Sequence, residues 1–393
     1  MSQDVVVLKF GEIFLKGQNR GYFEQKLLDG VKRATAGMKV RVDHVHARVL
    51  VEVEPGDRER AVSRLSRVFG VQKLSPARVV PGDLDAVTVE AVVAMEELLA
   101  RRPPGRTPPT FKVDCRRSDK SFPIRSDEVS AHVGYHIINA TGLTVDVHHP
   151  DITIGIEIGP HRTFVFAETL MGPGGLPVGA SGRVNLLISG GIDSPVAGWL
   201  AMKRGCNLLT TYFHSFPYTG DKTKEKVTAL VRLLAAWQGP TRLVVPRFTD
   251  TQKALRNAGA AELAVVLYRR MMLRTAAVIS RRMGAAALCT GDNLAQVASQ
   301  TLINLGVIEE ATDMMVLRPL LTNDKHETVA LARRLGTFET SIQPYDDCCS
   351  LFVPSHPATS ARLADVHKAE ARLDVVALAD KLADDAEIIE VTP

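Results

Sequence analysis

The stretch that most constrains the fold is residues 184–195, which read Val-Asn-Leu-Leu-Ile-Ser-Gly-Gly-Ile-Asp-Ser-Pro. An apolar run passes through a turn of small residues into the start of a helix. A turn of this kind directs backbone amides and the positive end of the helix dipole at one spot, which favours phosphate. The turn lacks the Gly-Lys-Ser/Thr ending of the common triphosphate loop and the Gly-x-Ser-x-Gly of a hydrolase elbow. The alternative is an ordinary strand-to-helix turn with a serine cap.

The chain after residue 183 predicts a doubly wound α/β domain. Five apolar strands alternate with helices, at residues 184–189, 208–213, 243–248, 287–291 and 315–317. Such alternation is typical of a parallel sheet with helices on both faces. Ligands of these sheets bind at the carboxyl ends of the strands, which is where the glycine-rich turn lies.

The chain before that domain predicts two smaller α+β units. Residues 1–78 follow the order strand, helix, two strands, helix, strand, which is typical of a ferredoxin-like fold. The last of these strands is expected to be a short one near Val71. Residues 79–168 begin with a helix at 85–100, followed by a proline-rich loop, a basic segment, a short helix and further strands. Glycine and proline are frequent in residues 169–182, which predicts a linker to the third domain at 183–393.

Composition excludes several classes of protein. The net charge of +4 permits a nucleic-acid partner without proving one. The chain shows no leader peptide and no apolar run long enough for a membrane span, so we expect a cytoplasmic protein without a membrane partner. The 5 cysteines show no Cys-x-x-Cys spacing, so neither a disulfide framework nor a zinc or iron–sulfur site is predicted.

The glycine-rich turn supplies the first candidate site residues. The amides of Gly190 and Gly191 can approach a phosphate closely, and the hydroxyls of Ser189 and Ser194 can add hydrogen bonds. Asp193 would repel phosphates unless a cation lies between them, which implies a Mg²⁺ bridge or a role in orienting pyrophosphate. A simple helix cap is the competing interpretation of Asp193.

Two further groups of cations are candidates for a phosphate site. Arg269 and Arg270 lie at the centre of a helix predicted at 261–283, where a phosphate contact and a solvated helix face are both open. Lys325 follows Asp324, whose spacing to Glu327 predicts a capping box. A lysine at a helix start opposes the dipole, which favours charge neutralisation at a phosphate site.

A pair of cysteines, Cys348 and Cys349, follows two acids in an irregular stretch. A loop thiol can act as a nucleophile or carry a persulfide if nearby cations lower its pKa. The adjacent acids act in the opposite direction, so the activating charge must come from elsewhere. Cys206 and Cys289, in Arg-Gly-Cys-Asn-Leu-Leu and Ala-Ala-Leu-Cys-Thr-Gly, are interpreted as small buried side chains.

A basic segment at residues 111–125 is a candidate RNA contact. It contains Arg116, Arg117 and Lys120 and is flanked by Phe111 and Phe122, which suits phosphates and base stacking. A solvated turn is the usual alternative for a short run of charge.

These motifs, in this order, resemble the tRNA uracil 4-sulfurtransferases over essentially the whole chain. Ser-Gly-Gly-x-Asp-Ser at 189–194 is similar to the pyrophosphatase loop, which cleaves ATP between its α and β phosphates. Residues 11–24 resemble the opening signature of the family, and residues 111–125 resemble the core of its RNA-binding THUMP domain. The resemblance implies that ATP adenylates O4 of uridine 8 in tRNA and that a cysteine persulfide then replaces the oxygen, giving 4-thiouridine.

The resemblance also implies roles for particular residues. Asp193 and Lys325 match residues needed for adenylation, and Cys348 matches the sulfur-bearing cysteine, although Cys349 stays open as a participant. Lys16 and Arg20 are candidate RNA contacts of the opening signature. The nucleotide pocket is predicted to contain Leu187, Ile188, Ser189, Gly190, Gly191, Ser194, Tyr212, Phe213, Arg269, Gly291 and Gln300.

Cofactors and partners follow from the same family. ATP and Mg²⁺ are the expected cofactors, and tRNA is the expected substrate. The chain resembles the short form without a rhodanese domain, so a cysteine desulfurase or another persulfide donor is expected to supply sulfur. The family's second role, in making the thiazole of thiamine, is in doubt for this form. The sequence does not determine the oligomeric state, and a homodimer is one of the possibilities.

Two other functional classes stay open at this point. Another pyrophosphatase-loop enzyme, such as an amide-forming ligase, would consume ATP with a small acceptor and no RNA. A THUMP-bearing RNA-binding factor would turn over no ATP, and a methyltransferase would need a glycine-rich adenosylmethionine loop that is not visible in the sequence.

Overall fold

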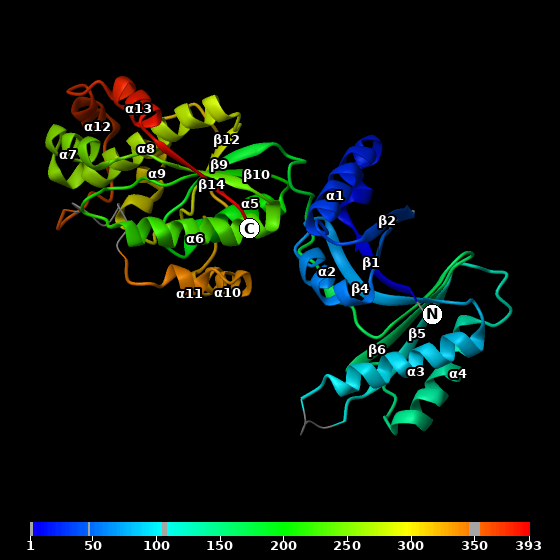
Figure 1. Ribbon diagram of the computed structural model, residues 1–393. Coiled ribbons are helices and arrows are strands. Elements are labelled where there is room, and N and C mark those ends of the chain that lie inside the picture. Colours follow the sequence, from blue (N-terminus) through cyan, green and yellow to red (C-terminus); the bar gives the residue numbers. More distant parts are fainter. Residues whose placement is uncertain (1–2, 46–47, 104–107, 346–353) are drawn as a thin grey trace. The chain divides into compact units, whose positions relative to one another are not determined.

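The computed structural model describes residues 3–45, 48–103, 108–345 and 354–393 (Figure 1). The chain forms two compact units, Met1–Gly175 and Leu176–Pro393. The division between them falls inside the predicted linker. Among the described residues, no helix combines the length and apolar character needed to cross a membrane.

The first unit contains one sheet with strand order β2-β3-β1-β4-β7-β6-β5, and β8 pairs with β4. The strands are β1 (Gln3–Phe10), β2 (Val40–Val45), β3 (Arg48–Val53), β4 (Val71–Val80), β5 (Phe111–Arg117), β6 (Ile152–Ile158), β7 (Thr163–Phe166) and β8 (Leu170–Met171). The helical segments are η1 (Glu12–Asn19), α1 (Arg20–Ala34), η2 (Pro55–Asp57), α2 (Arg58–Leu65), α3 (Leu84–Ala100) and α4 (Ser126–Thr141).

The predicted ferredoxin-like order is confirmed by β1, α1, β2, β3, α2 and β4. The expectation of only a short strand near Val71 is wrong, because β4 extends to Val80. The reason is tertiary pairing. The end of β4 pairs with β1 on one side, at Gln3↔Val79, and with β7 on the other, at Val79↔Phe164. One sheet therefore continues from the ferredoxin-like part into the following part.

The apolar run in β1 reflects burial on both faces of this sheet. Val6 and Leu8 belong to the core under α1 and α2, whereas Val5 and Val7 pack with Phe164 on the opposite face. Alternate residues of a strand point to opposite faces, so an unbroken apolar run fits a strand covered on both sides.

The second unit contains a sheet with strand order β13-β12-β9-β10-β11-β14. The strands are β9 (Arg183–Leu187), β10 (Asn207–Thr211), β11 (Thr241–Val245), β12 (Ala287–Cys289), β13 (Val316–Leu317) and β14 (Glu387–Val391). The helical segments are α5 (Asp193–Lys203), α6 (Asp221–Gln238), α7 (Thr249–Ala258), η3 (Ala261–Leu263), α8 (Ala264–Met283), η4 (Ala298–Gln300), α9 (Leu302–Glu309), α10 (Lys325–Leu335), α11 (Phe338–Ser341), α12 (Leu363–Glu370) and α13 (Val375–Asp384).

The five predicted strands are present and pair in parallel. β14 is not among the strands predicted from the sequence. It pairs antiparallel with β11, from Thr241↔Val391 to Val245↔Glu387. Its sequence, Glu-Ile-Ile-Glu-Val, is short and carries two acids, so it has little of the apolar signal that marks the central strands.

Helices cover both faces of this sheet, as predicted (Figure 1). Two neighbouring residues of β9 point to opposite faces of the sheet and contact different helices. Leu186 packs under α5 so closely that a Cβ on Gly198 would lie 2.6 Å from its side chain. Asn185 points the other way, to α8, where its amide donates to the carbonyl oxygen of Ala276 at 3.2 Å.

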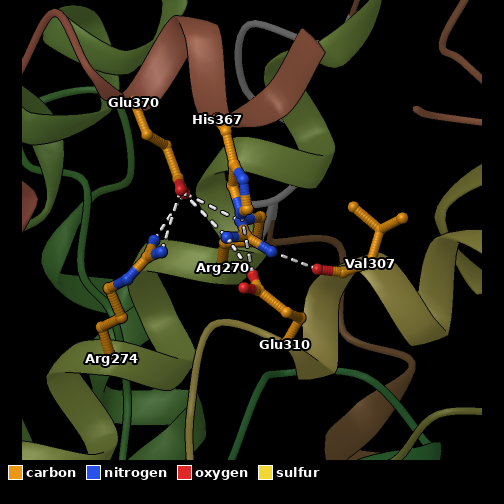
Figure 2. Close-up of polar contacts among 6 residues, drawn as sticks. All are labelled: Arg270, Arg274, Val307, Glu310, His367 and Glu370. Atoms are coloured by element: carbon orange, nitrogen blue, oxygen red, sulfur yellow. Dashed lines mark hydrogen bonds and ion pairs between the residues drawn. The ribbon is translucent and has the colours of Figure 1, made fainter. Parts of the chain in front are cut away.

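A buried ion-pair cluster joins α8, α9 and α12 (Figure 2). Arg270 has no exposed surface, and its guanidinium donates to the Glu370 carboxylate at 2.8 and 2.9 Å and to Glu310 at 2.7 Å. It also donates to the carbonyl oxygen of Val307, near the end of α9. Arg274, one turn further along α8, pairs with the same Glu370. The solvated helix face considered for this arginine is therefore wrong.

Candidate functional site

A pocket lies at the carboxyl ends of β9, β10 and β12, where the order of the parallel strands reverses. This switch point is the usual ligand site of an open α/β sheet. Gly190 belongs to the same turn but not to the lining, and Asp193 joins the lining. The predicted nucleotide-binding residues that line the pocket are Leu187, Ile188, Ser189, Gly191, Ser194, Tyr212, Phe213, Arg269, Gly291 and Gln300.

Hydrogen bonds between serines give the glycine-rich turn its shape. The hydroxyl of Ser194 accepts from the backbone amide of Ser189 at 2.9 Å, and the two hydroxyl oxygens lie 3.2 Å apart. The amide of Gly191 donates to the Ser189 hydroxyl at 3.3 Å. The turn is thus closed by its own side chains at the amino end of α5, where the helix dipole favours an anion.

Gly291 allows two backbone turns to meet. A Cβ at this position would lie 2.6 Å from the backbone nitrogen of Ser194 and 2.8 Å from its Cα. No side chain fits there, so the turn after β12 packs directly on the first turn of α5. This contact brings the two strand ends of the pocket together.

Asp193 and Lys325 form an ion pair at the edge of the pocket. The Nζ atom of Lys325 lies 2.7 and 3.0 Å from the two carboxylate oxygens, and Gln296 donates to the same carboxylate at 3.1 Å. Asp193 is the first residue of α5, and the residue at the N-cap position is Ile192, whose side chain has no hydrogen-bonding group. The capping box predicted at Asp324 and Glu327 is present and places Lys325 at the start of α10.

Asp292, in the turn after β12, is the centre of a buried polar cluster at the pocket wall. Arg269 and Arg318 both pair with its carboxylate, and the hydroxyl of Thr290 donates to it at 2.8 Å. Gln300 donates to it at 3.3 Å. Burial by itself would raise the pKa of Asp292, but the arginines and hydrogen bonds outweigh that effect and lower it. The aspartate is therefore held ionised, and it fixes Arg269 at the wall.

The remaining walls are apolar. Tyr212 and Phe213 follow β10, Met272 and Leu273 come from α8, and Ile308 comes from α9. A pocket with an apolar side and a glycine-rich anion-binding side fits a ligand that joins an aromatic base to phosphates.

Cys348 and Cys349 lie outside the described residues. The other three cysteines are buried. Burial raises the pKa of the Cys206 and Cys289 thiols, which agrees with their interpretation as inert buried side chains. Burial likewise raises the pKa of Cys115 to about 11.

Lys16 and Arg20 lie near the start of α1 in the first unit. The ammonium of Lys16 is 5.2 Å from the ring centroid of Phe23, and the Arg20 guanidinium is 4.5 Å from that of Phe14. Arg20 also pairs with Glu24 at 2.6 Å. Aromatic and acidic neighbours hold both cations in position, and their contact with RNA stays a prediction.

The basic segment differs from expectation in its aromatic residues. Phe111 and Phe122 are buried in the core under α3 and α4, so their proposed stacking on bases is wrong. The reason is that each occupies an inward position of the local fold. Arg117 donates to the carbonyl oxygen of Ile124 at 2.8 Å and so shapes the loop, whereas Arg116 and Lys120 are exposed.

Sequence reasoning missed Asp292, Arg318 and Gln296 as members of the site. Asp292 and Arg318 closely follow β12 and β13, at the carboxyl edge of the sheet. Polar residues in that position are candidates in any parallel sheet, so this signal was present in the sequence.

Fold and pocket together define a nucleotide-binding α/β protein of the pyrophosphatase-loop class. Residues 179–375 match the family described as thiamine biosynthesis protein (ThiI). Residues 5–75 match the ThiI ferredoxin-like domain, and residues 90–168 match the THUMP domain. The chain belongs to the ThiI family.

Two relatives and one solved structure match this chain over nearly its full length. A probable tRNA sulfurtransferase of Moorella thermoacetica is 46% identical over 99% of this chain and 98% of its own length. That of Halothermothrix orenii is 43% identical, covering 98% of each chain. The crystal structure of a 4-thiouridine synthetase–RNA complex with bound ATP matches with a TM-score of 0.90 and 35% identity, covering 99% of this chain and 100% of that one.

Proposed function

We propose that this protein is an ATP-dependent tRNA sulfurtransferase that converts uridine 8 of tRNA to 4-thiouridine. The observation that carries the proposal is the full-length match to a 4-thiouridine synthetase bound to RNA and ATP. The pocket at the switch point of the second unit supplies a site of the right chemistry for ATP. The curated relatives named as probable tRNA sulfurtransferases support the same activity.

The proposed reaction has two steps. Oxygen O4 of the uracil attacks the α-phosphorus of ATP, an O–P bond forms, and pyrophosphate leaves. The terminal sulfur of a persulfide then attacks C4, the C–O bond breaks, and AMP leaves. A thiol finally cleaves the S–S bond, so the thiol and the carrier cysteine form a disulfide while the sulfur stays on C4.

The turn at residues 189–194 would bind the phosphates of ATP. Its amides lie at the amino end of α5, and Lys325 adds a positive charge there, 2.7 Å from Asp193. Arg269, on α8, would contribute a second positive charge to the pocket lining. Positioning and electrostatic stabilisation are the main contributions that a protein makes to chemistry at phosphorus.

Asp193 is the better of two carboxylates to hold Mg²⁺ with the phosphates. Asp292, the other carboxylate of the lining, is buried and pairs with two arginines, whereas Asp193 pairs with a single lysine at the edge of the pocket. One carboxylate together with substrate phosphates is a usual protein contribution to a Mg²⁺ site. When bound there, the ion would neutralise charge on the departing pyrophosphate.

Cys348 is the proposed carrier of the persulfide, with Cys349 beside it as the alternative or as the resolving thiol. The sulfur would come from a cysteine desulfurase or another persulfide donor. We further propose Lys16, Arg20, Arg116 and Lys120 as tRNA contacts, the cytoplasm as the compartment, and a homodimer as the assembly to test by sedimentation.

Nucleoside analysis tests the function directly. Unmodified tRNA is incubated with the protein, ATP, Mg²⁺ and a cysteine desulfurase with cysteine as persulfide donor, then digested and examined for 4-thiouridine. Formation of 4-thiouridine at position 8 is expected. ATP consumption with a small acceptor and no RNA would point instead to an amide-forming ligase, and the absence of ATP turnover would point to an RNA-binding factor.

Asp193→Asn tests the pocket. The carboxylate acts on charge that develops during adenylation, so the rate of tRNA-dependent pyrophosphate release is expected to fall about 100-fold. Asp250→Asn is the matched control, because Asp250 is an exposed acid in the first turn of α7 and should leave the rate unchanged.

Cys348→Ala tests the sulfur carrier. Pyrophosphate release with tRNA should continue while 4-thiouridine formation stops. Full thiolation by this variant would contradict the assignment and would direct the same experiment to Cys349→Ala.

A further inference from the structure

A single buried side chain, Asn304 on α9, connects two segments of the second unit. Its side chain has no exposed surface. Its amide nitrogen donates to the carbonyl oxygens of Ala298 and Ala358 at 2.7 and 2.8 Å, and its amide oxygen accepts from the backbone N–H of Ala361 at 2.9 Å. Two carbonyls and one N–H as partners leave only one orientation of the amide.

The first segment is part of the nucleotide pocket. Ala298 begins η4, and the next two residues, Ser299 and Gln300, line the pocket. The Ser299 hydroxyl lies 3.3 Å from Nη1 of Arg269, and Gln300 donates to Asp292 at 3.3 Å. Asn304 therefore holds the backbone of Ala298, directly next to two residues of the pocket wall.

The second segment follows the cysteine pair in the sequence. Ala358 and Ala361 belong to the stretch that resumes at Pro354 and leads into α12. Thr301, the N-cap of α9, donates from its hydroxyl to the carbonyl oxygen of Thr359 at 2.8 Å. The amide of Ala358 donates to the carbonyl oxygen of Glu262 in η3 at 2.9 Å. The start of α9 is thus attached to this stretch at several points.

The chain before the cysteine pair is also held by a buried polar side chain. Lys226 on α6 is 5% exposed, and its Nζ atom donates to the carbonyl oxygen of Gln343 at 2.8 Å. Both flanks of the cysteine pair are therefore attached to the body of the second unit. Of the two buried side chains Asn304 and Lys226, Asn304 is the one whose hydrogen bonds also reach the segment next to the pocket wall.

We propose that Asn304 is a positioning residue for sulfur transfer. It holds the segment after the cysteines at a defined distance from the pocket wall beside which the adenylated uracil is formed. This inference rests on the proposed function, because it takes one cysteine of the pair to carry the sulfur. Neither Asn304 nor Ala298 lines the pocket, so we expect an anchor of this kind to act on the second step of the reaction while other residues bind ATP. Small displacements of reacting groups cost large factors in rate.

Asn304→Ala tests the proposal through the coupling of the two steps. Under single-turnover conditions with persulfide-loaded protein, pyrophosphate release should stay within about 3-fold of the unsubstituted protein. The fraction of adenylated tRNA that becomes 4-thiouridine should fall about 10-fold, with the remainder returned to uridine by water as AMP leaves. Hydrogen exchange of the peptide covering residues 354–361 should quicken, because the amide of Ala361 loses its acceptor.

Thr301→Asp is a second variant that keeps the protein testable if Asn304→Ala folds poorly. Aspartate retains the N-cap of α9 but cannot donate to Thr359, whereas Thr301→Ser retains both contacts and is the matched control. Uncoupling by Thr301→Asp but not by Thr301→Ser supports the proposal.

A proportional loss of adenylation and thiolation would overturn the proposal, because it would show that the anchor only maintains the fold. Unchanged coupling despite faster hydrogen exchange would also overturn it. Failure of the proposed function itself is distinguishable, since the unsubstituted protein would then form no 4-thiouridine.

Discussion

Arg269 and Arg270 are adjacent on α8, yet they belong to two different buried ion-pair clusters. Arg269 pairs with Asp292 at the wall of the pocket, and its side chain is 16% exposed. Arg270 pairs with Glu370 and Glu310 between helices and is 0% exposed. Successive residues of a helix are rotated by about 100°. Neighbouring arginines can therefore serve the ligand site and the packing of helices separately.

The two clusters differ in what surrounds the acid. Asp292 faces a pocket and is held by side chains that themselves line it, namely Arg269 and Gln300. Glu370 is enclosed by Arg270 and Arg274, and its partners reach no part of the lining. A buried ion pair such as Arg270–Glu370 holds helices together. Removing one partner leaves the other charge unpaired in the interior. Substitutions in the two clusters should therefore affect different properties.

The largest effect is expected for Arg270→Met. This change leaves Glu370 buried with one partner fewer and removes the donor to Val307, so the free energy of unfolding should fall by about 3–5 kcal/mol. Urea unfolding of the full chain measures it. Arg281→Met is the matched control, because Arg281 lies on the same helix in an exposed pair and should cost less than about 1 kcal/mol. An equal loss of unfolding free energy in the two variants would show that the buried pair of Arg270 contributes no more than the exposed pair of Arg281.

A smaller and different effect is expected for Arg269→Met. Asp292 keeps Arg318 and Thr290 as partners, so most of the fold should be retained. The loss of a cation at the pocket wall should weaken ATP binding about 10-fold, which corresponds to about 1.4 kcal/mol. Isothermal titration with ATP checks this. Unchanged affinity together with a large loss of stability would place both arginines in the same structural class.

Arg274→Met should cost about 1 kcal/mol of unfolding free energy, because Glu370 keeps both hydrogen bonds from Arg270. Thermal or urea unfolding measures the change, and ATP affinity should be unaffected. A loss as large as that of Arg270→Met would mean that the two arginines share the acid equally.

The smallest effect is expected from pH. Burial opposes the charge of Glu370, but Arg270 and Arg274 outweigh it and lower the pKa of Glu370 in the folded protein. An unfolded glutamate has a pKa of about 4.3. The contribution of the ionised Glu370 to the free energy of unfolding is therefore complete above about pH 5. It is lost as the pH falls below the unfolded pKa and through the lower pKa of Glu370 in the folded protein. Between pH 5 and pH 4, Glu370→Gln should lose less stability than the unsubstituted protein. If the free energy of unfolding fell equally with pH in both proteins, the result would contradict this prediction.

Much of the fold could be predicted because its signals are local. The five parallel strands and the ferredoxin-like order follow from hydrophobic runs and glycine-rich boundaries. The capping box at Asp324 and Glu327 is present where its spacing placed it. β14 and the length of β4 escaped prediction, because both depend on a partner strand far away in the chain, β11 for the first and β7 for the second.

The sequence predicted which residues line the candidate pocket better than it predicted which side chains contact one another there. Ser189, Gly191 and Ser194 carry a motif, and they line the pocket. Phe111 and Phe122 show the opposite case, since an aromatic residue in a basic segment gives no sign of which way its side chain points. Burial of both was decided by packing under α3 and α4.

The sequence by itself determined the glycine-rich turn at residues 189–194, the order of the elements and the family, because these depend on short motifs and on their order along the chain. Only the tertiary structure decided which charges meet. Lys325 reaches Asp193 across 132 residues, and Arg270 reaches Glu370 across 100. The physical reason is that a charge finds its partner through the packing of whole helices and strands, and this packing leaves no trace in the local spacing of residues.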